Sequence, residues 1–410
     1  MKKINYKILL NLVVFCLPLY LIKANIFGLP TNVFEIAALL LIFFSLLHKR
    51  KIISSELRNL PRSLMFGSAL ILAGTILSLL FNENKLTGLG ILKSWFLIPM
   101  LFSFTLYIFT DSISDLKNSL RALFFSTSLV GLTALVYKIS GLVTFDNRLS
   151  AFYLSPNHLA MYLAPGLIFG AYFLFDAISK KILPSIIFYL FSTALVTVPL
   201  FYTYSYGAWI ALILSAIIVT VASFPKSKQL LKIIFLASII FSTLLISQLG
   251  TEKLTDAINL SPRSSLSSRA TIWLASIRLI QQRPFIGIGP GNFQDSYLSL
   301  QSHFPPYLEW AVPQPHNIFL AFWLQAGILG IAGFLIVLFF VLNRLFQLLK
   351  HKKNEALASS FLLFFLYTLL HGIIDTTYWK NDLSVIFWSC ILFSVFLHKY
   401  YLRKKPSCKC

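Results

Sequence analysis

Long runs of apolar residues constrain the fold of this chain more than any other feature of its sequence. An α-helix needs about 20 mostly apolar residues to cross the hydrocarbon core of a bilayer. We find about twelve such runs, at residues 7–22, 32–47, 63–81, 91–110, 119–139, 157–176, 183–203, 207–224, 230–249, 317–342, 356–373 and 383–398. They are continuously apolar, whereas the strands of a membrane barrel alternate. The sequence therefore predicts an all-α polytopic membrane protein with about 12 transmembrane helices.

The composition excludes the competing classes of protein. Hydrophobic residues make up 57% of the 410 positions and charged residues only 12%, about half the charged share of a soluble globular domain. The formal net charge of +21 would suit a nucleic-acid-binding protein, but this degree of hydrophobicity would not. We therefore expect membrane lipids, and no nucleic acid, among the partners.

The basic residues predict how the helices are oriented. Most of the 35 Lys and Arg residues fall in alternate loops, and cytoplasmic loops are the ones that carry such an excess. Both termini are therefore expected in the cytoplasm. The basic N-terminus and the apolar run after it resemble a signal peptide. No small-residue cleavage site follows them, so we interpret the run as an uncleaved first helix.

One loop is much longer than the others. We divide the chain into helices 1–9 at residues 1–249, a partly helical outer loop at 250–316, helices 10–12 at 317–402, and a cytoplasmic tail at 403–410. A loop of this length is usually functional or disordered. This one contains Trp273, Phe285, Phe293 and Trp310, which favours folding, so we expect the chemistry of the protein in this loop.

The middle of the outer loop is predicted to be helical. Ser267 or Ser268 can cap a helix that runs to about Gln282, because a serine side chain accepts a hydrogen bond from the free backbone N–H groups of the first turn. Pro284 follows and is expected to stop the helix.

Four arginines lie between Asp256 and Asp295 with no acidic residue among them: Arg263, Arg269, Arg278 and Arg283. A guanidinium group binds phosphate oxygens in pairs and keeps its charge, which makes this stretch a candidate phosphate site. The alternative is an interfacial helix whose arginines reach lipid headgroups. Arg269 and Arg283 share a helical face but would lie about 21 Å apart along a straight helix, so they cannot share one diphosphate unless the helix breaks.

Two further motifs follow in the outer loop. The segment GIGPG at 287–291 predicts a tight turn whose backbone approaches another part of the chain closely. Pro290 stands where a dinucleotide-binding helix would begin, which argues against that motif. His316 precedes span ten, and histidine is the side chain most readily used as a base near neutral pH. The alternative is a histidine that caps the helix or lies among the headgroups.

Taken in order, four segments resemble the O-antigen ligase family and its polymerase relatives. They are SSRATIW at 267–273, RPFIGIGPGNF at 283–293, PHN at 315–317 and AGILG at 326–330. The close motif similarity covers about 80 residues, and the twelve-span layout with its large outer loop agrees as well. In this resemblance, His316 corresponds to the family's histidine before the tenth span and Arg269 to its loop arginine. We include Asn317, from the same motif, among the substrate-binding candidates.

The resemblance implies an enzyme of the bacterial inner membrane with its active site on the periplasmic face. Such an enzyme moves a glycan from undecaprenyl diphosphate to an acceptor hydroxyl, which for a ligase belongs to a lipid A-core sugar. The sequence has no Asp-x-Asp motif, so we expect no metal and no cofactor. Arginine would then stabilise the diphosphate leaving group, and His316 would deprotonate the acceptor in an inverting reaction.

One departure from the family pattern concerns a second cation. Where the family commonly has Ser-Arg-Gly, this chain has Tyr206 between Ser205 and Gly207. Tyr206 can donate a hydrogen bond to phosphate but brings no charge, and Arg283 or Arg263 are candidates to compensate.

Other polar residues near the outer face join the candidate site. Asn157 resembles a recurrent family asparagine. His371 and Asp375 resemble a family pair expected to shape the acceptor site; the alternative is a structural hydrogen-bonded pair.

Three other functions stay open from the sequence. An O-antigen or exopolysaccharide polymerase would use the same donor with a lipid-linked glycan as acceptor. A protein O-oligosaccharyltransferase is disfavoured by the short chain, which lacks an added C-terminal outer domain. A transporter of lipid-linked sugars would carry polar or broken helices near the bilayer midplane, whereas here the charges concentrate at the two faces.

Overall fold

The computed structural model describes residues 6–26, 29–81, 84–223, 228–259, 261, 264–304, 311–350 and 355–403, and most of them are helical. The elements follow the predicted apolar runs. They are α1 Tyr6–Phe15, η1 Leu17–Leu21, β1 Lys23–Ile26, β2 Leu29–Asn32, α2 Val33–Arg58, α3 Arg62–Leu80, α4 Lys85–Ile91, η2 Leu92–Leu97, α5 Ile98–Ile108, α6 Ile113–Ile139, α7 Pro156–Ser179, α8 Leu183–Tyr202, α9 Tyr206–Ser223, α10 Lys228–Ile246, α11 Glu252–Ile258, α12 Ser265–Gln282, α13 Phe293–Gln301, α14 Ile318–Lys350, α15 Glu355–Gly372 and α16 Asn381–Arg403.

Eight helices within the described ranges are long and apolar enough to cross a membrane. Helix α1 and residues Ala356–Gly372 are shorter apolar helices. The chain is therefore an all-helical protein with several membrane-spanning candidates, as the sequence predicted. The number of twelve spans stays a prediction.

Two local features were not predicted, and one local expectation was wrong. Helix α2 is kinked at Lys49, close to the predicted end of the second apolar run, and continues from there to Arg58. A short antiparallel hairpin, β1 with β2, separates η1 from α2. The cap of α12 is Ser264, whose side chain accepts from the backbone N–H of Ser267. A run of serines offers several caps, and the sequence did not distinguish them.

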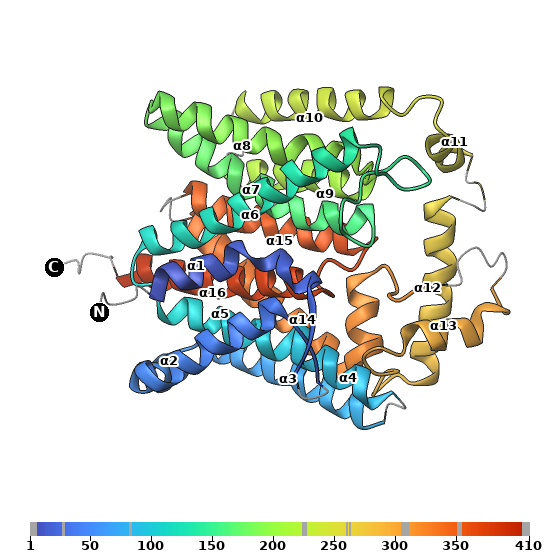
Figure 1. Cartoon of the computed structure of the whole chain (residues 1–410), viewed down its shortest axis with the longest axis horizontal. Coiled ribbons are helices and arrows are strands. Elements are labelled where there is room, and N and C mark those ends of the chain that lie inside the picture. Colours follow the sequence, from blue (N-terminus) through green and yellow to red (C-terminus); the bar gives the residue numbers. More distant parts are fainter. Residues whose placement is uncertain are drawn as a thin grey trace.

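The outer-loop helices lie at one end of the bundle. Figure 1 shows the start of α1 and the end of α16 at the left, and α11, α12 and α13 at the right. Helix α12 runs across the right-hand end of the bundle rather than along it. The predicted outer loop and the predicted cytoplasmic ends of these helices are thus on opposite ends of the molecule.

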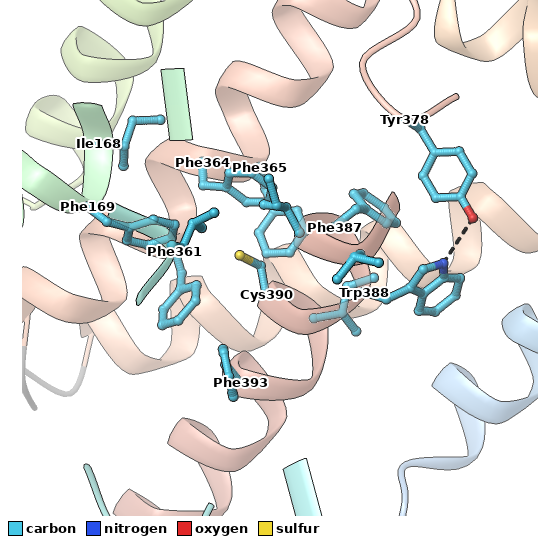
Figure 2. Close-up of a cluster of buried hydrophobic side chains, with 14 of the residues drawn as sticks. Ile168, Phe169, Phe361, Phe364, Phe365, Tyr378, Phe387, Trp388, Cys390 and Phe393 are labelled. Atoms are coloured by element: carbon cyan, nitrogen blue, oxygen red, sulfur yellow. Dashed lines mark hydrogen bonds between the residues drawn. The ribbon is translucent and has the colours of Figure 1, made fainter. Parts of the chain in front are cut away.

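Aromatic side chains from α7, α15 and α16 fill the centre of the bundle (Figure 2). Phe169 of α7 packs edge-on against Phe361 of α15, with ring centroids 5.6 Å apart, and both are fully buried. Phe365 of α15 packs on Phe387 of α16 in the same manner at 5.9 Å. Inside a bilayer such helix contacts are held by close packing rather than by exclusion of water.

A second, smaller core belongs to the outer loop. Ile272 and Leu279 of α12, Phe293 of α13 and Leu324 of α14 bury their side chains together. This core fixes α12 against the first turns of α14. It therefore sets the position of the residues that α12 and α14 present at the end of the bundle.

The GIGPG turn docks into a break in α14. Gly327 interrupts α14 with φ 64° and ψ −166°. The backbone N–H of Ile288 donates to the Leu324 carbonyl at 2.7 Å, and that of Ile328 donates to the Phe285 carbonyl at 3.0 Å. A Cβ on Gly287 would lie 2.3 Å from the Leu324 oxygen. The predicted tight turn with close backbone approach is confirmed.

The connection between α15 and α16 is anchored by polar groups. The Tyr378 hydroxyl donates to the Trp95 carbonyl at 2.6 Å and accepts from the Trp388 indole at 3.0 Å. The Asn381 amide donates to the buried Glu35 carboxylate at 3.0 Å, and Lys93 pairs with that carboxylate at 2.8 Å. These contacts hold residues 373–380 in place at the site described next.

Candidate functional site

Asp375, between α15 and α16, lies at the centre of a polar cluster. Its side chain is only 4% exposed. One carboxylate oxygen, Oδ1, accepts from the backbone N–H of Thr376 at 2.9 Å and lies 3.2 Å from His316 Nδ1. The other, Oδ2, accepts from the Asn157 amide at 2.9 Å and lies 3.6 Å from Arg269 Nη2. A buried carboxylate needs such partners, and here they come from three distant parts of the chain.

His316 is held from both sides just before α14. Its φ of 46° lies in the left-handed region, which a residue with a Cβ seldom adopts. The Trp273 indole donates to the His316 carbonyl at 3.2 Å. Asn317 caps α14 by accepting from the backbone of Phe319 and Leu320, and its amide donates to the Ile373 carbonyl at 2.8 Å.

The contact with Asp375 also sets the tautomer of His316. An ionised carboxylate can only accept, so Nδ1 must carry the hydrogen of the bond that joins the two side chains. When the ring is neutral, Nε2 therefore has a free lone pair. The His316 side chain remains 28% exposed, which leaves the ring accessible from outside the cluster.

Arg269 of α12 approaches the same carboxylate. Its Nε donates to the Ile374 carbonyl at 2.6 Å, and Nη1 donates to the Ser265 carbonyl at 3.1 Å and to the Ser265 hydroxyl. The side chain is 14% exposed. A guanidinium group has five N–H donors, and these contacts leave some of them available to a phosphate.

The partners of Asp375 determine its ionisation. Burial by itself opposes the charged form, but the hydrogen bond from His316 and the electrostatic attraction of His316 and Arg269 outweigh burial. Together they hold the pKa of the Asp375 carboxyl well below its usual range. The cluster thus contains a permanent negative charge between two basic side chains.

Arg148 also belongs to the cluster, although the sequence motifs did not single it out. It stands in the connection between α6 and α7 and donates from Nη2 to Asn157 Oδ1 at 2.6 Å. Its Nε donates to the Thr203 carbonyl at 2.8 Å. The sequence signal for it is a basic residue between two apolar runs, which does not specify a partner.

The remaining predicted residues lie around or away from the cluster. His371 Nδ1 and the Tyr367 hydroxyl form a hydrogen bond of 2.9 Å within α15. The His371 side chain is therefore hydrogen-bonded to Tyr367 and not to Asp375. The Tyr206 hydroxyl, at the start of α9, donates to Gln248 at 3.0 Å. Arg283 ends α12, which is unbroken from Ser265, so it lies about 21 Å from Arg269 along the helix. Arg263 lies outside the described residues.

The fold and the site together define a class: a multi-pass helical membrane protein with a His–Asp–Arg cluster at one end of its bundle. Residues 191–335 match a protein-family model described as O-antigen ligase. This segment is therefore similar to the O-antigen ligase family, as the motifs indicated. A comparison with curated proteins finds no match.

The matched segment contains only part of the cluster. Arg269 and His316 lie within residues 191–335, whereas Arg148, Asn157 and Asp375 lie outside them. The groups that surround the candidate base are therefore contributed by flanking helices.

Proposed function

We propose that this protein is an O-antigen ligase. It transfers a glycan from undecaprenyl diphosphate to a hydroxyl of a lipid A-core sugar on the periplasmic face of the inner membrane. The observation that carries the proposal is the contact of His316 and Arg269 with opposite oxygens of the buried Asp375 carboxylate. A base and an anion-binding cation are thereby held at fixed positions beside one another.

The proposed reaction begins with the acceptor hydroxyl. His316 Nε2 takes its proton while Nδ1–H stays bonded to Asp375, whose charge stabilises the imidazolium that forms. The acceptor oxygen attacks C1 of the first sugar from the face opposite the leaving group, and the C1–O bond to the diphosphate breaks. Undecaprenyl diphosphate leaves with the electron pair, so the configuration at C1 is inverted. The proton on Nε2 is then released to water.

Arg269 assists the leaving group in this reaction. Negative charge grows on the diphosphate as the bond breaks, and a preoriented guanidinium stabilises it. The hydrogen bonds from Arg269 to Ile374 and Ser265 fix the direction of the side chain before substrate arrives. We propose that its remaining N–H groups hold the phosphate oxygens. Tyr206 and Asn317 are proposed to line the same substrate region.

Mass spectrometry of surface glycans from a deletion strain tests the acceptor. For a ligase, we expect lipid A-core without polymer, together with full-length polymer still attached to its lipid carrier. Complementation with the wild-type gene should restore the polymer on lipid A-core. Single-repeat glycans in the deletion strain would overturn the ligase assignment and favour the polymerase.

A further inference from the structure

The interactions of Arg148 point to a role beyond the loop in which it lies. Its side chain is 14% exposed. The guanidinium donates from Nε to the Thr203 carbonyl, donates from Nη2 to Asn157 Oδ1, and lies 3.8 Å from Asp146 through Nη1. It therefore joins the connection before α7, the first turn of α7 and the connection before α9.

The bond from Arg148 determines which way the Asn157 amide faces. A guanidinium has only donors and an ionised carboxylate only acceptors. With Oδ1 facing Arg148 at 2.6 Å, the Asn157 Nδ2 group faces Asp375 and donates to its Oδ2 at 2.9 Å. The reverse amide orientation would set N–H against N–H on one side and oxygen against oxygen on the other. Arg148 thus selects the orientation that satisfies Asp375.

The effect extends from Asp375 to the candidate base. The Asn157 amide fixes Oδ2 of the carboxylate, and the backbone N–H of Thr376 fixes Oδ1. With both oxygens held, Oδ1 is directed at His316 Nδ1. Four side chains therefore form one chain of hydrogen bonds: Arg148, Asn157, Asp375 and His316.

We propose that Arg148 is a positioning residue that acts through Asn157 to hold the Asp375–His316 pair in its working geometry. This inference rests on the proposed function of His316 as the base. It assigns Arg148 no contact with the donor or the acceptor.

The surroundings of Arg148 show that its burial and the backbone conformation around it are unfavourable for the free energy of folding. Burial lowers the pKa of the guanidinium from its ordinary value, although the group stays charged beside Asp146. The neighbouring residues Asn147 and Ala151 have φ values of 57° and 51°, and Tyr204, in the loop that accepts from Arg148 Nε, has 45°. Strained backbone persists where surrounding contacts over-determine it, often at functional sites.

A double-mutant cycle on the purified full-length enzyme tests the inference. We expect Arg148→Met and Asn157→Leu each to lower kcat about 10- to 100-fold, the usual range for residues that orient a catalytic group, with KM for the lipid-linked donor within about twofold. The double variant should be no slower than Asn157→Leu alone, because Arg148 acts through that residue. Arg148→Lys should restore part of kcat, since lysine can still donate to the amide oxygen.

Additive losses in the cycle, or a rise in donor KM for Arg148→Met alone, would overturn the inference and indicate direct contact with the diphosphate. Arg50→Met supplies the control, because Arg50 is exposed on α2; it should leave kcat unchanged. Thermal unfolding of each variant normalises the rates to folded protein. If His316→Ala retained activity, the proposed function itself would fail, whereas an essential His316 with an additive cycle would refute only this inference.

The pH dependence of Asn157→Asp provides a second readout. The new carboxylate would face Asp375 Oδ2, and two carboxylates at hydrogen-bond distance share a proton as pH falls. The charged and titratable groups around Asp375 are His316, Arg269, His371, Lys380 and Tyr367, with Arg148 behind residue 157. We expect the activity of Asn157→Asp relative to wild type to rise on acidification, because the shared proton restores the bond. A ratio that stays flat with pH, as expected for Asn157→Leu, would contradict the proposed orientation of residue 157.

Discussion

At the scale of single residues, His316 has a strained backbone conformation that hydrogen bonds to its neighbours hold in place. Its positive φ directs the ring toward Asp375 while its carbonyl accepts from Trp273 and its neighbour Asn317 starts α14. A backbone conformation of this kind costs of order 1–3 kcal/mol and is kept only where other contacts impose it. The position of the imidazole is therefore set by the fold and not by the local sequence.

We expect His316→Ala to reduce glycan transfer by about 10²-fold or more, the usual contribution of a general base. Binding of the lipid-linked donor should change little, since Arg269 is intact. The measurement is transfer to acceptor by the purified enzyme, with donor binding assayed in parallel. His303→Ala is the control, because His303 is exposed in the same loop. Full activity of His316→Ala would remove the base from the mechanism.

Asp375→Asn keeps the shape of the side chain but removes its charge. We expect kcat to fall about 10- to 100-fold, because the amide no longer enforces the Nδ1–H tautomer of His316 and no longer stabilises the imidazolium. The ratio of initial rates at saturating donor and acceptor measures the effect. Unchanged rates would mean that Asp375 serves only to compensate the charge of Arg269.

The depressed pKa of Asp375 sets the pH range in which it contributes to stability. A carboxyl whose folded-state pKa lies below its unfolded value of about 3.9 stabilises the fold fully above that value. That stability is lost as pH falls through the folded-state pKa. The difference in unfolding free energy between wild type and Asp375→Asn should thus not shrink as pH falls from 8 to 5, because protonation of His316 strengthens its contact with the carboxylate, and should shrink only below about pH 4. A difference that already shrinks between pH 8 and 5 would contradict the depressed pKa.

At the scale of elements, the break in α14 decides where the site residues stand. Gly327 lets the chain turn sharply, so that the carbonyl of Leu324 becomes free to accept from the GIGPG turn. The GIGPG turn also anchors the end of α12, the helix that carries Arg269. The first turns of α14, which follow His316, and α12 are thereby locked to each other.

Gly327→Ala should destabilise the protein by about 1–3 kcal/mol or more. The new Cβ would lie 2.3 Å from the Phe285 oxygen at a φ of 64°, a clash combined with an unfavourable backbone conformation. A lower midpoint in a thermal unfolding assay in detergent would show the effect. Gly90→Ala is the matched control, because a Cβ there meets nothing within 4 Å; within helix α4 it should be neutral or stabilising. Equal midpoints for the two variants would refute the role of the break.

At the scale of the whole molecule, the arrangement of the bundle makes the topology testable. In a variant whose four native cysteines are replaced, a cysteine at Ser299 on α13 should react in intact cells with a thiol reagent that cannot cross the inner membrane. A cysteine at Lys181, in the basic turn after α7, should react only after permeabilisation. Both positions are exposed. The reverse labelling pattern would invert the predicted orientation.

Much of the fold could be predicted because it depends on local properties of the sequence. The apolar runs predicted the helices, and Pro284 predicted the end of α12. The glycines of GIGPG predicted the close turn. The cap at Ser264 was not predicted, because neighbouring serines offered equivalent choices. The hairpin and the part of α2 beyond its kink at Lys49 lie outside the apolar runs and were not predicted either.

For the candidate site, residues could be predicted from the sequence, but the contacts between their side chains could not. His316 and Arg269 were recognisable from their motifs, but their shared contact with Asp375 joins residues 59 and more than 100 positions apart. The pairing of His371 with Tyr367 is a local i,i+4 contact within α15, whereas the link from Arg148 through Asn157 to Asp375 depends on tertiary contacts like those of His316 and Arg269. No periodicity along the sequence specifies such contacts.

The place of Asp375 between the last two helices has a consequence for biogenesis. A ribosome that has delivered α1 to α14 into the membrane has already made His316 and Arg269, yet the carboxylate that joins them is still to be synthesised. The proposed base therefore gains its partner only when α15 and α16 have been threaded and folded against α7. We therefore expect an incompletely translated chain to transfer glycan poorly, because it lacks the carboxylate that orients the proposed base.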